Sequence, residues 1–231
     1  MSDENAPVHL PLLDAQEGSG SGLHEAKPSW RGWIHAGTFP VAIALGVILV
    51  ALAQGAEATL ACLIFAVTSA LLFGISALYH RINWKPATKQ LFRRLDHCNI
   101  FLLIAGTYTP IAALALPPEK GTPILWIVWG ATALGIGFRM FWLSAPRWIY
   151  VALYLLLGWG IVMFIGDLFA ANAPAMLLVL IGGLLYTLGA IAYATKRPNP
   201  FPGAFGFHEI FHTCTVLAYL CHWVAVLLIA T

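Results

Sequence analysis

Residues 207–230 read FHEIFHTCTVLAYLCHWVAVLLIA, a stretch in which Glu209 is the only charged side chain. About 20 consecutive apolar residues in a helix cross the hydrocarbon core of a bilayer. Other apolar runs of similar length precede this one, at residues 36–53, 58–80, 97–116, 122–140, 147–166 and 173–195. The sequence therefore predicts an all-α membrane protein, a bundle of seven transmembrane helices.

The overall composition also indicates a lipid bilayer as the environment of the chain. Hydrophobic residues make up 60% of the sequence and charged residues only 10%, whereas soluble domains contain about 25% charged residues. A transmembrane barrel is excluded, because its strands alternate in hydrophobicity over about ten residues, and these runs are apolar on every side. No block of basic residues is long enough to indicate a nucleic-acid partner.

The distribution of basic residues predicts the orientation of the bundle. Eleven of the twelve Lys and Arg residues precede the first run or lie in the loops after the second, fourth and sixth runs: Lys27, Arg31, Arg81, Lys85, Lys89, Arg93, Arg94, Arg139, Arg147, Lys196 and Arg197. Lys120 alone lies on the other side. Short loops rich in Lys and Arg stay in the cytoplasm. We therefore expect a cytoplasmic N-terminus and a C-terminus outside.

The N-terminal residues differ in kind from the rest of the chain. Residues 1–30 are polar and include GSGSG at 18–22, a composition typical of flexible linkers. We predict a disordered tail over 1–30, followed by a single transmembrane domain over 31–231. The tail lacks the basic and apolar regions of a secretory signal, so the first helix is expected to remain in the mature protein.

His208 and His212 are spaced for metal binding. Side chains at positions i and i+4 lie on the same face of a helix, one turn apart. Both imidazoles can therefore bind one ion. A catalytic zinc site uses three protein ligands and leaves a fourth position to water. We predict a zinc site in which His80 is the third ligand.

The predicted topology brings further polar residues to the same level. His80 ends the second run, Asp96 precedes the third and His208 begins the seventh, and the charge count places all three ends on the cytoplasmic side. Ser76 lies four residues before His80 and shares its helix face. One site results if helices two, three and seven pack together. Asp96 and Ser76 are then the candidate catalytic residues.

Each of these residues also has a purely structural explanation. His80 could stabilise the negative end of its own helix, and His208 with His212 could form an interfacial pair. Asp96 could cap the third helix, and Ser76 could bond to a carbonyl one turn back. Their shared depth favours one site over several coincidences.

Other polar residues are expected to lie outside the metal site. Glu209 is predicted to complement the dipole of the first helical turn, and His97 to lie at the membrane interface. His222 follows His212 by ten residues, about 15 Å along the helix, so it cannot bind the same ion. We expect it to form a hydrogen bond within the bundle. The four cysteines are expected to be free thiols.

Three separated motifs carry a resemblance to a known family. They are Ser76-Ala77-Leu78-Tyr79-His80, then Asp96 after a basic loop, then His208-Glu209-Ile210-Phe211-His212. In this order they resemble the S-x-x-x-H, D and H-x-x-x-H pattern of the hemolysin III proteins, which belong with the progestin and adiponectin receptors in a seven-helix superfamily. The resemblance covers roughly residues 30–231 and includes the segments 106–110 and 197–200.

The resemblance implies a zinc ion held by His80, His208 and His212 near the cytoplasmic face of a bacterial plasma membrane. It also implies that Asp96 hydrogen-bonds to zinc-bound water and that Ser76 lies just outside the ligand set. Family members often have Glu, Asn and Thr before a His in the first helix. Here residues 30–34, WRGWI, precede His35, so no role is carried over to His35.

Three classes of function follow from this site. The first is a zinc-dependent hydrolase in the membrane, in which zinc activates water, Asp96 orients or deprotonates it, and the substrate is a lipid amide or ester. The second is a receptor or sensor of lipid or membrane state with a structural zinc. The third is a pore-forming cytolysin. The pore is the weakest of these, because helices one, four and six carry almost no polar residues at mid-membrane.

Overall fold

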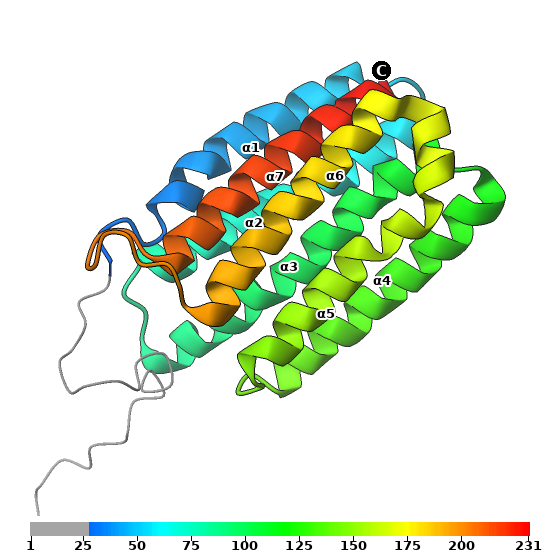
Figure 1. Cartoon of the computed structure of the whole chain (residues 1–231). Helices are drawn as coiled ribbons and strands as arrows, with labels where there is room; N and C mark the ends of the chain where they lie inside the picture. Colours follow the sequence, from blue (N-terminus) through cyan, green and yellow to red (C-terminus); the bar gives the residue numbers. More distant parts are fainter. Residues whose placement is uncertain (1–27) are drawn as a thin grey trace, which may run out of the picture.

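The structure is a computed structural model, and it describes residues 28–231. The predicted tail over 1–30 falls almost wholly outside the described residues. The elements, in chain order, are α1 (Trp33–Leu52), α2 (Ala56–Arg81), α3 (Pro86–Ala115), α4 (Pro118–Phe141), α5 (Arg147–Trp159), the 3-10 helix η2 (Gly160–Phe164), α6 (Ile165–Thr195) and α7 (Phe207–Ala230). Figure 1 shows these helices side by side with their axes roughly aligned. The prediction of an all-α membrane protein is confirmed.

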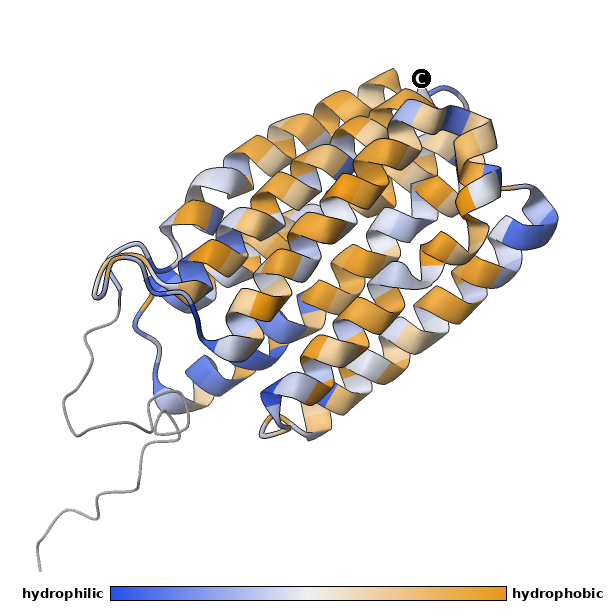
Figure 2. Ribbon diagram, viewed as in Figure 1, coloured by the Kyte–Doolittle hydropathy of each residue, from blue (hydrophilic) through white to orange (hydrophobic). Residues whose placement is uncertain are grey.

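The helix surfaces are apolar along most of their length. Figure 2 shows hydrophobic residues over the middle of the bundle and hydrophilic residues gathered at its two ends. Among residues 28–231, six segments are long and apolar enough to cross a membrane, and Arg147–Thr195 counts as one of them. The prediction of seven crossings therefore stays a prediction, because two of the predicted runs, 147–166 and 173–195, lie within this one segment.

The segment Arg147–Thr195 folds back on itself. Nη1 of Arg147, at its start, donates a hydrogen bond of 2.8 Å to the carbonyl oxygen of Tyr193, near its end. The reversal includes a break at Asn172, whose φ of −158° and ψ of 93° are not helical. Oδ1 of Asn172 accepts a hydrogen bond from the backbone N–H of Ala175, as a helix N-cap does. Pro174 follows, where a missing N–H costs nothing in a first turn.

The third helix begins earlier than its apolar run predicts. The run starts at residue 97, but α3 starts at Pro86, a residue favoured in the first turn because its φ is already helical. Residues 86–96, PATKQLFRRLD, are more polar than the apolar run and are still helical, and they lie at a hydrophilic end of the bundle. Asp96 is therefore inside a helix. The alternative that Asp96 caps the third helix is wrong.

Helices α2, α3 and α7 pack against one another, as the single-site prediction requires. The end of the bundle where α2 ends and α3 and α7 begin is called the histidine end below. At the close approach of α2 and α3, Gly106 faces the buried side chain of Thr68. A Cβ on residue 106 would overlap the Thr68 side chain. Gly106 thus allows the two helices to approach closely.

Replacing Gly106 with alanine should destabilise the bundle. The added methyl group forces Thr68 or the helices apart, and overpacking of this kind costs about 1–3 kcal/mol. Thermal unfolding in detergent measures the effect. Gly137→Ala is the matched control, because nothing lies within 4 Å of a Cβ at that position in α4. Equal unfolding temperatures for both variants would contradict the proposed close contact.

Candidate metal centre

Three buried histidines meet at the histidine end. His80 comes from the last turn of α2, whereas His208 and His212 come from the first two turns of α7. One ring nitrogen of each lies within 4.8 Å of one ring nitrogen of each of the others. The Nε2 atoms of His80 and His208 are 3.2 Å apart. In the described part of the chain, these three side chains are close enough together to hold one metal ion.

The donor set fits a metal ion of the zinc type. Imidazole suits zinc, copper, iron and nickel, and the Zn–N distance is about 2.0–2.1 Å. Two nitrogens on one zinc ion are thus no more than about 4.2 Å apart, so the three rings need only small rotations. His80 and His212 are more than 90% buried, and all three histidines lie at the wall of a cavity. Three ligands leave room for a fourth, exchangeable one.

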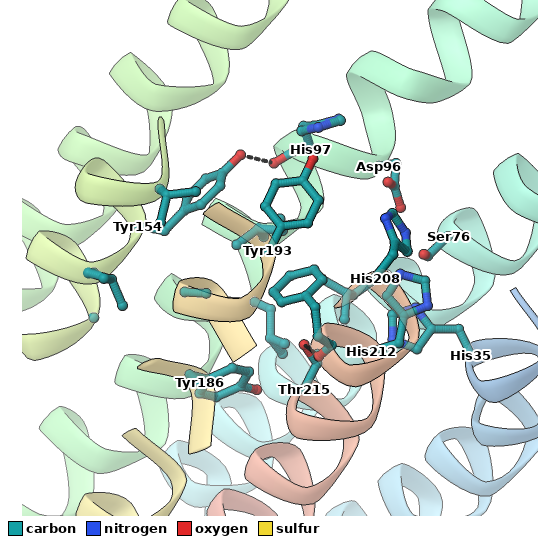
Figure 3. A pocket seen from close by; sticks show the side chains of 18 of the residues that line it. His35, Ser76, Asp96, His97, Tyr154, Tyr186, Tyr193, His208, His212 and Thr215 are labelled. Carbon is teal, nitrogen blue, oxygen red and sulfur yellow. Dashed lines mark hydrogen bonds between the residues drawn. The ribbon is translucent and has the colours of Figure 1, made fainter. Parts of the chain in front are cut away.

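Asp96 and Ser76 lie beside the three imidazoles. Oδ2 of Asp96 is 3.9 Å from Nε2 of His80, and the Asp96 side chain is 18% exposed. Ser76 is 2% exposed and lies one turn before His80 on α2. Figure 3 shows the carboxylate of Asp96 and the hydroxyl of Ser76 close to the histidine rings. The structure therefore brings all five predicted site residues together.

His35 of α1 also reaches the cluster. Its ring stacks on that of His212, with 3.7 Å between centroids and 7° between planes, and it forms a T-shaped pair with the ring of Phe73. His35 is 3% exposed, and neither ring nitrogen forms a hydrogen bond to a described residue. His35 is not one of the residues grouped by the 4.8 Å distance. Its contact with the site is through the ring of His212.

Glu209 is buried beside the metal ligands and paired with Arg31. Its Oε1 accepts a hydrogen bond of 2.6 Å from Nε of Arg31, and its Oε2 accepts one of 2.9 Å from the backbone N–H of Gly206. The Glu209 side chain is 1% exposed. Glu209 lies in the first turn of α7, as predicted. Its pairing with Arg31 was not predicted. The ion pair fixes the start of α7, where His208 lies.

The segment before α1 packs over the histidine end. The backbone N–H groups of Ser29 and Trp30 donate to the carbonyl oxygens of Gly203 and Ala204, in the loop between α6 and α7. Gly32 has a φ of +81°, and a Cβ on it would lie 2.6 Å from Cβ of His80. A side chain at residue 32 would therefore be strained and would push His80 out of place.

A cavity of about 1370 Å³ opens from the site. Its wall includes His80, Asp96, His208 and His212 at one end, and it continues between α3, α5, α6 and α7 toward the middle of the bundle. Figure 3 shows the side chains that line it. Pockets for drug-sized ligands measure about 300–1,000 Å³, so this cavity has room for a larger molecule.

Comparison with known proteins agrees with the motifs. A family profile described as "Haemolysin-III related" matches residues 23–223. The chain belongs to the hemolysin III family. Within this family, the chain is 36% identical over 151 residues to the hemolysin-3 homolog of Bacillus subtilis (strain 168), covering 65% of the chain and 68% of that protein. The hemolysin III match includes every residue of the candidate metal centre.

Two further relatives widen the comparison. Hemolysin-3 of Bacillus cereus is 36% identical over 158 residues, which cover 68% of the chain and 69% of that protein. The progestin and adipoQ receptor-like protein 1 of Caenorhabditis elegans is 31% identical over 174 residues, which cover 66% of the chain and 39% of that protein. The hemolysin III family therefore lies within the progestin and adiponectin receptor superfamily, as the motifs indicated.

The structure also bears on the predictions for His222, the cysteines and His97. Nε2 of His222 donates to the carbonyl oxygen of Val179, which confirms a hydrogen bond within the bundle. The four cysteines are free, as expected. His97 is buried, however, and its Nδ1 donates to the carbonyl oxygen of Arg93. Helix α5 covers it, since the rings of His97 and Tyr150 are 5.6 Å apart, and its predicted place at the membrane interface stays a prediction.

Proposed function

We propose that this protein is a zinc-dependent hydrolase of lipid amides or esters, with His80, His208 and His212 as the metal ligands. The observation that carries the proposal is the meeting of three buried imidazoles at one end of a large cavity, with a carboxylate beside them. When bound, zinc makes a water molecule more acidic and polarises a scissile carbonyl group. The proposal assigns the remaining steps to residues of the chain.

Asp96 is the proposed general base. Its carboxylate lies 3.9 Å from Nε2 of His80 and borders the cavity, so it can accept a proton from water held near the three imidazoles. Ser76 lies one helical turn before His80 on α2. Its hydroxyl can form a hydrogen bond with the same water or with the substrate.

The cavity supports a lipid as the substrate. Near Asp96 its wall is polar, and beyond Ile100, Leu103 and Ile104 of α3 it becomes apolar. An acyl chain fits such a wall, because apolar side chains there replace the lipid tails that surround the chain in the bilayer. The amide or ester group of the lipid then lies at the polar end, close to the three imidazoles.

Fatty-acid release tests the proposed reaction. Purified protein, loaded with zinc and reconstituted into lipid bilayers, should release fatty acid from a panel of lipid amides and esters. The same protein stripped of zinc should release none above background, and restored zinc should restore the release. Equal release with and without zinc would contradict a zinc-dependent hydrolase.

A second candidate is a receptor or sensor in which zinc only holds the helices together. The name of the relative from Caenorhabditis elegans, a receptor-like protein, favours this alternative. A zinc ion between α2 and α7 would join the second and last helices of the bundle. Zinc removal would then lower the unfolding temperature, and zinc-loaded protein would release no fatty acid from any lipid tested.

The proposed orientation has seven crossings, a cytoplasmic N-terminus and a C-terminus outside. The fold-back of Arg147–Thr195 supports two crossings in that segment, since Lys120 and Asp167 pair at the end of the bundle away from Arg147 and Tyr193. The bacterial relatives support a bacterial plasma membrane as the location. The three imidazoles then lie near the cytoplasmic face.

Reporter fusions should confirm this orientation. A reporter active only in the cytoplasm should be active when inserted at Lys85 and inactive when fused after Thr231. A reporter active only outside should give the reverse pattern. Cytoplasmic activity after Thr231 would contradict either the seven crossings or the orientation.

A further inference from the structure

The cavity extends far beyond the metal centre. Along α7 it is lined from His208 to His222, and along α3 from Asp96 to Ile111. At 1.5 Å per residue, His222 lies about 15 Å along α7 from His212. The cavity wall is therefore polar at the histidine end, apolar over the middle turns of α3, and polar again around His222.

His222 is held at this depth by specific contacts. It is 8% exposed, and its Nε2 is 3.1 Å from the carbonyl oxygen of Val179 on α6. Gly182 faces the ring, and a Cβ at that position would overlap it. Because the carbonyl group can only accept, Nε2 must carry the proton, and the neutral ring then has an acceptor at Nδ1. That Nδ1 is buried and has no partner among the described residues.

Tyr186 of α6 stands next to His222. Their ring centroids are 5.5 Å apart, both residues line the cavity, and the buried hydroxyl of Tyr186 also has no partner among the described residues. Two other hydroxyls of the cavity wall are satisfied: that of Tyr108 donates to the carbonyl oxygen of Leu157, and that of Thr215 to the carbonyl oxygen of Phe211. Tyr186 and His222 thus have unused hydrogen-bonding capacity.

We propose that His222 and Tyr186 form a second binding point in this cavity, for a hydroxyl group on the hydrocarbon chain of a lipid. A hydroxyl both donates and accepts, so it can donate to Nδ1 of His222 and accept from the hydroxyl of Tyr186. A buried polar group without a partner costs about 1–3 kcal/mol, and such a ligand removes this cost. An ionisable residue deep in a membrane bundle is commonly functional.

The position of the pair defines where the hydroxyl lies on the ligand. With its carbonyl group at the three imidazoles, a lipid must place the hydroxyl about 15 Å away, at mid-chain, to reach His222. The inference rests on the proposed function, because it assumes that the cavity takes an acyl chain. The new element is that His222 and Tyr186 would favour lipids with a hydroxylated chain, because the metal centre alone does not distinguish such lipids from others.

Binding of free fatty acids tests the inference without requiring turnover. The probes are octadecanoate, 12-hydroxyoctadecanoate and 2-hydroxyoctadecanoate, each competing with a fluorescent fatty acid for zinc-loaded protein in nanodiscs. Wild-type protein should bind the 12-hydroxy acid at least about threefold more tightly than octadecanoate, because each of its two hydrogen bonds has a net value of about this size or more. The 2-hydroxy acid should show no such gain, because its hydroxyl lies at the carboxylate end.

Substitutions of Tyr186 and His222 test whether these two residues cause the preference for the 12-hydroxy acid. Tyr186→Phe keeps the ring and removes the hydroxyl, so it should weaken the preference for the 12-hydroxy acid, and His222→Leu should weaken it as well. Tyr219→Phe is the matched control: the Tyr219 hydroxyl is also buried without a partner, but Tyr219 does not line the cavity. It should keep the preference of wild type. A weaker preference in Tyr186→Phe but not in Tyr219→Phe would exclude bilayer partitioning as the cause, because partitioning is the same for both variants.

Two results would overturn the inference in distinguishable ways. Equal binding of octadecanoate and the 12-hydroxy acid by wild type, or an unchanged preference in Tyr186→Phe, would reject the second binding point and leave the cavity as a lipid site. Binding of none of the three acids would reject the lipid-binding cavity itself, and the proposed function with it.

Discussion

His208→Ala and His80→Ala proteins should each lose most of their zinc, whereas wild-type protein carries about one ion per chain. Each change leaves only two imidazoles of the three that lie within 4.8 Å. Mutating even a residue that merely orients a ligand costs about 10–100-fold in metal affinity, and the loss of a ligand itself should cost more. Elemental analysis of purified protein, after dialysis against a weak chelator, measures the occupancy.

His222→Ala is the control for this zinc prediction. His222 is also a buried histidine of α7, but it lies about 15 Å from His212 along the helix. This variant should keep its zinc. A folded His208→Ala, His212→Ala double variant with wild-type zinc content would refute the site, because no more than one of the three ligands would remain.

Asp96→Asn should keep zinc and lose hydrolytic activity by about 10²–10⁴-fold, the usual contribution of a general base. Asparagine has nearly the same shape as aspartate, but it cannot accept a proton from water. The zinc content should stay near one per chain because Asp96 is not among the three grouped ligands. Fatty-acid release per zinc ion, compared between wild type and variant, measures the loss.

Comparison with His80→Ala separates the two roles. That variant should lose both zinc and activity, whereas Asp96→Asn should lose activity alone. If Asp96→Asn also lost its zinc, Asp96 would be a ligand. If wild-type and Asp96→Asn proteins with full zinc both released no fatty acid above the zinc-free control, the sensor function would replace the hydrolase.

The sequence predicted that His80, His208 and His212 lie together because the motifs that contain them are short and periodic. The spacing of His208 and His212 defines a helix face, and the same rule links Ser76 to His80. The one-sided distribution of basic residues then placed the ends of three helices at one level. These arguments need only helix geometry and membrane topology. They can therefore be made before it is known how the helices pack.

Other features depend on packing and could not be predicted. The stacking of His35 on His212 joins α1 to α7, and the pairing of Arg31 with Glu209 spans 178 residues. No local pattern marks such partners. The start of α3 was misplaced because the apolar run ends where the membrane does, whereas the helix continues to Pro86. Pro86 itself was the signal that could have located this start.

X-ray absorption at the zinc edge of the purified wild-type protein tests the central claim most directly. The account predicts three imidazole nitrogens and one further light ligand, from water or substrate, at about 2.0–2.1 Å from zinc. A shell of four protein ligands, such as a fourth imidazole from His35 or a sulfur from a cysteine, would contradict an open catalytic position. Absence of bound zinc from the folded protein would contradict the metal centre altogether.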